Sequence, residues 1–235
     1  MTFTYVIEHM EEDETTPKSL PPWVELEYAH MIMLAGINGR VEFTHLSHNS
    51  SSLLDARLAP INESPASYQV HTQSVMELLE QNNIPITRVC LLDPKAQTVL
   101  APEDGEIFDH FLFGVRSVSA ETSCSLNNLT SGRKGILGDD PPRDRTSELR
   151  QLGFPSRHLG PMQMTTDTAL GVTKRVVDDK VQLNAIPYVD FPTITFNAKE
   201  SVEMPFRYIV NGKEPVLPPG MRELLHEDLN KSFDF

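Results

Sequence analysis

The chain has 235 residues, of which 39% are hydrophobic and 23% are charged. This composition is ordinary for a globular protein and argues against a chain that is disordered throughout. The 33 acidic residues outnumber the 20 basic ones and give a formal net charge of −13. That charge disfavours general binding to nucleic acid, because phosphate contacts need a basic surface, and it favours a basic or neutral partner.

The two cysteines, Cys90 and Cys124, give neither a disulfide framework nor a zinc-finger spacing. The short apolar run at the N-terminus lacks a basic leader and ends in a block of acids, which is unlike a signal peptide. No apolar stretch approaches the roughly 20 residues that cross a membrane. We therefore expect a cytoplasmic protein with no membrane contact and no metal centre.

The first third of the chain predicts strands that alternate with helices. TYVIEH (Thr4–His9) has the β-branched and aromatic content of a strand, and NGRVEFTHL predicts a turn followed by another. HTQSVMELLEQNN predicts an amphipathic helix, whereas the Ser-rich stretch 47–66 is expected to be irregular. An earlier helix, ending at Gly36, is predicted by apolar residues at helical spacing, which are Trp23, Leu26, Ala29, Ile32 and Met33.

Two later segments, RVCLLDP and FDHFLFG, are almost continuously apolar, which is typical of strands covered on both faces of a parallel sheet. SRHLG predicts a further strand. RDRTSELRQLG predicts a helix, and PMQMTTDTALGVTKRVVDD a longer one with Thr165 or Thr166 as N-cap. The fold class is therefore α/β. The last part of the chain is different: AIPYVDFPTITF and MPFRYIV are Pro-punctuated extended segments, and PPGMRELLHEDL predicts a final short helix.

The segment Val115–Lys134 fits neither pattern. It is rich in Ser, Thr and Asn and poor in large apolar side chains, a composition that cannot bury much surface. We expect a flexible insert that is dispensable for function.

Glycine-containing loops follow the predicted strands, at the edge of a parallel sheet where ligands bind. Gly135, Gly138 and Gly160 permit close approach of the backbone to a ligand, although tight turns alone would also explain them. Neither a Walker motif nor GxGxxG is present, which disfavours a phosphate cradle. The apolar and polar side chains of HLGPMQMTTDTA suit adenosine and an aliphatic sulfonium, although its methionines are also ordinary core residues.

Seven motifs give a more specific indication: IEHMEE, WVELEY, RVCLLDP, FDHFLFG, GILGDDPPRDRTSEL, RHLGPMQMTTDTA and MPFRYIV. In this order they resemble a eukaryotic family of SPOUT-class methyltransferases, the SPOUT-type protein arginine methyltransferases. The resemblance implies a SPOUT (α/β knot) fold, with a parallel sheet flanked by helices and a C-terminal trefoil knot. It also implies a monomer that uses S-adenosylmethionine to methylate an arginine of a small-subunit ribosomal protein. Residues 1–180 would form the methyltransferase domain, and 181–235 an extension packed on it.

The same resemblance implies the site residues. The cofactor-binding residues would be Leu91, Leu92, Phe113, Gly114, Gly135, Ile136, Leu137, Gly138, Leu159, Gly160, Met162, Gln163, Met164 and Thr165. Because a bidentate carboxylate orients a guanidinium well, acids near these loops are candidates for holding the substrate arginine. These catalytic candidates are Asp139, Asp140, Asp144, Glu8, Glu11 and Glu12. Each acid taken alone is also consistent with an ordinary solvated or helix-capping carboxylate.

Two other functions remain open at this point. An RNA methyltransferase would share the SPOUT fold, but the net charge of −13 opposes a polyanionic substrate. A non-catalytic module that binds a ribosomal protein would not need intact glycine loops.

Overall fold

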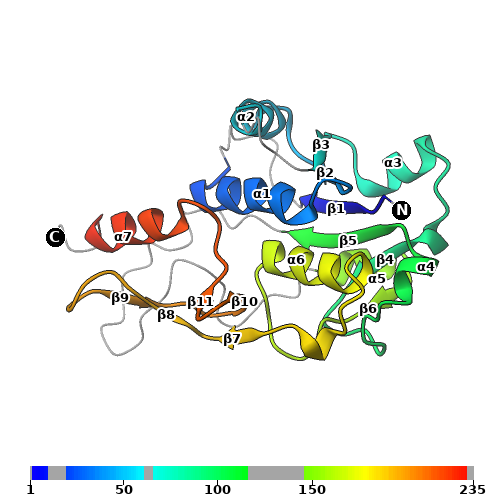
Figure 1. Ribbon diagram of the computed structural model, residues 1–235. Helices are drawn as coiled ribbons and strands as arrows, with labels where there is room; N and C mark the ends of the chain where they lie inside the picture. The colour runs from blue at the N-terminus through cyan, green and yellow to red at the C-terminus, as the bar shows by residue number, and fades with distance from the viewer. Residues whose placement is uncertain (1, 10–19, 61–65, 116–145, 232–235) are drawn as a thin grey trace.

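The computed structural model describes residues 2–9, 20–60, 66–115 and 146–231. Its centre is a six-stranded sheet in which every pairing is parallel and the strand order is β3-β2-β1-β5-β4-β6 (Figure 1). The strands are β1 (Thr4–His9), β2 (Arg40–Thr44), β3 (Ser67–Val70), β4 (Val89–Leu92), β5 (His110–Val115) and β6 (Ser156–Arg157). The predicted α/β class with a parallel sheet is thus confirmed.

Helices cover both faces of this sheet. Two clusters of buried apolar side chains result. The larger core lies between one face of the sheet and the first, second and sixth helices, and the smaller core lies between the other face and the third and fifth helices. Strand β1 shows why, because Tyr5 and Ile7 point into the larger core while Val6 points into the smaller one. The helices are α1 (Pro22–Ala35), α2 (His48–Leu58), α3 (Val75–Gln81), α4 (Asp104–Ile107), α5 (Ser147–Gln151) and α6 (Thr166–Val177), with 3-10 turns η1 (Ile86–Arg88) and η3 (Leu183–Ala185). No helix in the described ranges is long and apolar enough to cross a bilayer.

Most predicted elements are present, and their ends follow from local chemistry. Gly36 ends α1 with a φ of 77°, and Ser74 begins α3 with a complete capping box in which Glu77 is the partner. Thr165 is the N-cap residue of α6, but its hydroxyl donates to Thr168 Oγ1 at 2.8 Å instead of capping the backbone. Gly153, with a φ of 82°, follows α5.

The prediction of an irregular stretch at 47–66 is wrong, because α2 occupies much of it. Ser47 accepts a hydrogen bond from the Ser50 backbone and so begins the helix. Ser50, Leu54 and Leu58 are buried at a spacing of four residues, and the two leucines belong to the larger core. The serines between these residues obscure the helical spacing of the apolar side chains in the sequence. Strand β3 was also not predicted.

The predicted apolar face of α1 is partly wrong. Ile32 is fully buried, but Met33 is 46% exposed, and the buried side also includes Val24 and Tyr28. Trp23 and Leu26 pack against a separate C-terminal cluster. Helix α1 therefore has apolar neighbours on more than one side, which blurs a single stripe.

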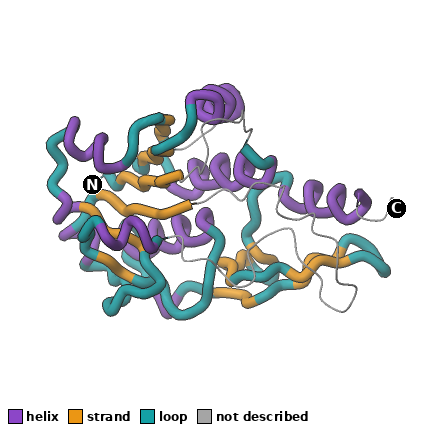
Figure 2. Tube along the Cα trace, turned by 180° about the vertical axis from the view of Figure 1, so that it is seen from behind, coloured by secondary structure: helices purple, strands orange, loops and turns teal. Residues whose placement is uncertain are grey.

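The C-terminal elements lie beyond the carboxyl ends of the parallel strands (Figure 1), and the reverse view in Figure 2 shows the same arrangement. A small antiparallel sheet, a hairpin and a helix make up this region. They are β7 (Tyr188–Asp190), β10 (Arg207–Asn211) and β11 (Glu214–Pro215) in the sheet, β8 (Thr193–Thr195) and β9 (Ser201–Glu203) in the hairpin, and α7 (Met221–Lys231). Ile209 of β10 joins the larger core, so this region packs directly on the parallel-sheet layer.

A Gly105→Ala variant is expected to lose about 2 kcal/mol of the free energy of unfolding, as in other overpacked cores. A Cβ at Gly105 would lie 2.8 Å from the Val177 carbonyl oxygen and 3.1 Å from Phe3 Cζ, so the backbone has to shift. Urea unfolding measures the loss. Glu106→Ala, at an exposed position of the same helix, should stay within about 0.5 kcal/mol of the parent; equal stability of both variants would contradict this packing.

Candidate cofactor-binding and active site

Three of the four predicted cofactor segments meet at one edge of the sheet. Strands β5, β4 and β6 are neighbours and run parallel, so their carboxyl ends lie side by side. Leu91 and Leu92 end β4, Phe113 and Gly114 lie near the end of β5, and 159–165 follow β6. Ligands of parallel α/β proteins bind at this edge. The fourth segment, 135–138, lies outside the described residues.

The large side chains at the strand ends are buried in the two cores. Only main-chain groups of these strand ends are therefore left to contact a ligand. Leu91 belongs to the smaller core, whereas Leu92 and Phe113 belong to the larger one, and all three are buried. Gly114 lies opposite Glu8 in the register of β5 and β1. Side-chain recognition at this edge therefore has to come from the loops.

The loop at 159–165 has the backbone that a close ligand approach requires. Gly160 has a φ of 99°, a region that side-chain-bearing residues rarely adopt, and its N–H donates to His158 Nδ1 at 3.1 Å. A Cβ added at Gly160 would meet no atom of the described residues within 4 Å beyond its chain neighbours, so the described part of the chain leaves space beside the loop. Leu159 and Met164 pack partly against the core, while Gln163 is exposed. The loop thus combines apolar surface, polar groups and room for a ligand.

A buried ion pair fixes the end of β4 to the start of α5. Arg150 donates to both carboxylate oxygens of Asp93, from Nε at 2.5 Å and from a terminal nitrogen at 2.7 Å. Asp93 also accepts from the Thr146 hydroxyl at 3.1 Å and the Lys95 N–H at 2.9 Å. Burial acts to raise the pKa of the Asp93 carboxyl, but these hydrogen bonds outweigh it and lower the pKa below its ordinary value. The pair therefore secures α5, the first described helix after the predicted loop at 135–138.

The C-terminal sheet holds the loop at 159–165 from another side. The Arg207 N–H donates to the Gln163 carbonyl at 2.9 Å, and Arg207 forms a parallel bridge with Met164. The Arg207 guanidinium donates to both Asp190 oxygens, at 2.6 and 2.9 Å, and lies 4.9 Å from the centre of the Tyr188 ring. Strand β10 is therefore in direct contact with the predicted cofactor loop.

Glu8 is the one candidate catalytic acid within the described residues. It is only 4% exposed, and one carboxylate oxygen accepts from the Thr44 hydroxyl and from the Val75 N–H at 2.9 Å. The other oxygen lies 3.6 Å from His45 Nδ1. Burial raises the pKa of Glu8, although the two hydrogen bonds oppose that effect. Glu8 thus joins β1, β2 and α3 at the carboxyl edge, and its catalytic role stays a prediction.

The other predicted acids, Glu11, Glu12, Asp139, Asp140 and Asp144, lie outside the described residues, as does 116–134 of the predicted insert. In the described ranges no group of three or more His, Cys, Asp or Glu side chains is placed to hold a metal ion.

Sequence reasoning missed a second buried contact near the site. His30 Nδ1 of α1 lies 2.7 Å from Asp167 Oδ2 in the first turn of α6, and Asp167 is 1% exposed. Asp167 follows the loop at 159–165 almost directly. This hydrogen bond therefore fixes the far end of the loop against α1. The sequence places Asp167 just inside the predicted helix that begins at Thr165 or Thr166, but it gives no sign of a partner that is 137 residues away.

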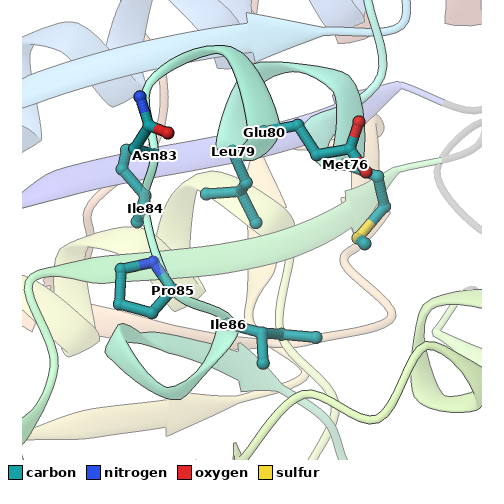
Figure 3. Close-up of a pocket in the computed structure, with 7 residues that line it drawn as sticks. All are labelled: Met76, Leu79, Glu80, Asn83, Ile84, Pro85 and Ile86. Carbon is teal, nitrogen blue, oxygen red and sulfur yellow. The ribbon is translucent and has the colours of Figure 1, made fainter.

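An apolar groove of about 440 Å³ lies apart from this edge (Figure 3). Its lining comes from α3, η1 and the turn between them, which precedes the amino end of β4. The lining residues are Met76, Leu79, Glu80, Asn83, Ile84, Pro85 and Ile86. None of the predicted site residues lines it.

Comparison with known proteins agrees with these features. A family model described as "Protein arginine N-methyltransferase SFM1-like" matches residues 4–115 and 132–232. The chain is 35% identical to protein arginine N-methyltransferase SFM1 of Saccharomyces cerevisiae over 239 aligned residues, covering 98% of this chain and 97% of that protein.

Solved structures of the yeast enzyme are also similar. The crystal structure of SFM1 with SAM has a TM-score of 0.73 at 34% identity, covering 97% of this chain and 92% of that one. The complex with SAH has a TM-score of 0.72 at 34% identity and covers 94% of each chain. The family resemblance found in the sequence is thereby confirmed, and the chain belongs to the SFM1-like family of protein arginine N-methyltransferases.

Proposed function

We propose that this protein transfers a methyl group from S-adenosylmethionine to an arginine of a basic protein, and that this substrate is a small-subunit ribosomal protein. The observation that carries the proposal is the match over almost the whole chain to a yeast arginine methyltransferase complexed with SAM. Convergence of the predicted cofactor segments on one sheet edge supports it independently.

The residues at this edge fit the donor. The left-handed Gly160 and the space that the described residues leave beside it permit a flat ring to approach the backbone. Apolar surface from Leu159 and Met164 suits the adenosine and the aliphatic chain, while Gln163 supplies polar groups. The family resemblance adds 135–138, Met162 and Thr165. When bound, the donor supplies an electrophilic methyl carbon on a positively charged sulfur.

The task of the protein is then to orient a guanidinium against that carbon. A nitrogen–carbon bond forms, the carbon–sulfur bond breaks with its electrons left on sulfur, and the nitrogen releases one proton. Arginine keeps its charge in proteins, so its nitrogen lone pairs are delocalised. A carboxylate that grips the other nitrogens localises positive charge away from the attacking one and aligns it at about 3–3.5 Å. Glu8, Glu11, Glu12, Asp139, Asp140 and Asp144 are the proposed acids.

The proposal includes a trefoil knot at the cofactor loops. In the sheet, β5 lies between β1 and β4, while β6 lies beyond β4. The strand order thus places β4 between β5 and β6, and the loops at 93–103 and 158–165, which follow β4 and β6, are hydrogen-bonded together through Leu100 and His158. Crossing connections at one edge are the arrangement that a knot needs.

We also propose that the enzyme is a cytoplasmic monomer that does not use RNA as its direct substrate. The low cysteine content and the net charge of −13 support the compartment and the substrate class. The monomeric state is tested by sedimentation of the purified chain.

The function is tested by incubating the purified protein with methyl-labelled S-adenosylmethionine and small ribosomal subunits, followed by digestion. Label that survives nuclease and is lost on protease treatment, and that mass spectrometry places on arginine, is the expected result. Label lost to nuclease alone would identify an RNA methyltransferase. Tight binding to the subunits without label would identify a non-catalytic binding module.

A further inference from the structure

Phe191 has a backbone conformation that needs an explanation. Of the four described non-glycine residues with positive φ, it alone is apolar, with a φ of 51°. A bulky residue in this region is a genuine outlier. Pro192 follows it, and a residue before proline ordinarily prefers extended backbone. The conformation therefore costs energy that the surrounding structure has to offset.

Hydrogen bonds on both sides hold Phe191 in place. Its N–H donates to the Phe206 carbonyl at 3.1 Å, and the next carbonyl, of Pro192, accepts from the Met204 N–H at 2.9 Å. The preceding residue, Asp190, is fixed by the two hydrogen bonds from Arg207. The strained conformation of Phe191 thus persists because hydrogen bonds of the neighbouring residues hold the backbone in place. Such strained residues are common at ligand-binding sites.

This strained backbone holds a large aromatic side chain outward, next to the predicted site. Phe191 is 46% exposed, so burial of its ring does not account for the strain. Strand β10 has β7 on one side and the bridge to Met164 on the other. Asp190, the last residue of β7, is therefore about 10 Å from the cofactor loop, or two strand spacings across β10, and Phe191 directly follows it.

We infer that Phe191 contacts the protein substrate, with its ring packed against an arginine-bearing basic segment. The inference rests on the proposed arginine transfer at the neighbouring loop. An aromatic face attracts a guanidinium and also packs against its aliphatic stem. The acidic balance of the chain favours a basic segment on the same surface. Phe191 thus supports substrate affinity, while donor affinity depends on the loop at 159–165.

The experiment compares the parent protein with Phe191→Gly, Phe191→Tyr and a control, Ile107→Ala. Ile107 is an equally exposed apolar residue, at 49%, and lies near the amino end of β5 on the opposite edge of the sheet. For Phe191→Gly, the KM for small ribosomal subunits should rise about tenfold while the KM for S-adenosylmethionine stays constant. Its melting temperature should not fall, because glycine adopts positive φ without strain. Phe191→Tyr and Ile107→Ala should keep the parental KM for subunits.

An unchanged subunit KM in Phe191→Gly would overturn the inference. A separate arm measures fluorescence anisotropy of a labelled dodecapeptide that contains Arg-Gly repeats, with S-adenosylhomocysteine present. If the parent protein labels no small-subunit protein, the proposed substrate is wrong, and the peptide-binding measurement then tests the contact made by Phe191. Peptide binding that weakens in Phe191→Gly but not in Ile107→Ala then supports the contact, and equal binding by all variants overturns it.

Discussion

A Gly160→Val variant is expected to lose 10- to 100-fold in affinity for S-adenosylhomocysteine. Gly160 has a φ of 99° in the proposed cofactor loop. A side chain in this region costs about 1–3 kcal/mol, most of all when it is β-branched. The loop has to change shape to relieve that strain, and about 1.4 kcal/mol of lost binding energy corresponds to a tenfold weaker complex. Isothermal titration calorimetry measures the dissociation constant directly.

Gly212→Val is the matched control for this substitution. Gly212 also has a positive φ, of 65°, and an added Cβ there would likewise meet no atom of the described ranges within 4 Å beyond its chain neighbours. It lies in the turn between β10 and β11, away from the loop at 159–165. This variant should lose stability but bind S-adenosylhomocysteine as the parent does. If Gly160→Val binds S-adenosylhomocysteine with the affinity of the parent, the loop at 159–165 is not part of the cofactor site.

An Arg150→Ala variant is expected to lose about 2–3 kcal/mol of the free energy of unfolding at pH 7. It leaves the Asp93 carboxylate, with 2% side-chain exposure, without its bidentate partner. Removing one member of a buried pair costs about 3–5 kcal/mol. We expect less because the Arg150 side chain is 33% exposed. Urea unfolding at several pH values measures the change.

The pH dependence gives this prediction a definite sign. In the folded parent the pKa of Asp93 is lowered. Its ion pair therefore adds stability above the unfolded-state pKa of about 3.9, and that stability is lost as the pH falls through the lower folded-state pKa. The difference between parent and variant should be full at pH 7 and shrink below about pH 4. A difference that stays constant into acid would mean that the loss comes from packing.

Arg222→Ala provides the comparison for a surface pair. Arg222 donates to Glu214 at 2.6 Å, but the two side chains are 44% and 73% exposed. Exposed pairs contribute about 0–1 kcal/mol. A small loss here beside a large one in Arg150→Ala would show that burial of Asp93 causes the difference.

Local patterns in the sequence predicted those parts of the fold that depend on neighbouring residues. Strands such as β4 and β5 are short apolar runs, and the amphipathic segment HTQSVMELLEQNN contains α3. Helix α2 was missed because serines dilute its apolar face, which only packing against the larger core reveals. Propensity is a weak guide where tertiary contacts decide.

Long-range partners were the part that sequence could not supply. The sequence places Asp93 at the end of an apolar strand. Its partner Arg150 is 57 residues away, and nothing in the sequence distinguishes Arg150 from other arginines in helices. Arg207 was part of a recognised motif, yet its contact with Gln163 depends on how the C-terminal sheet packs. Such pairs are set by topology, so a single sequence carries no periodic signal for them.

The most direct test is a crystal structure of the protein with S-adenosylhomocysteine. The account predicts the ligand at the carboxyl ends of β5, β4 and β6, in contact with the main chain of Gly160 and its loop. Binding in the groove beside α3, or at any site without contact to 159–165, would contradict it.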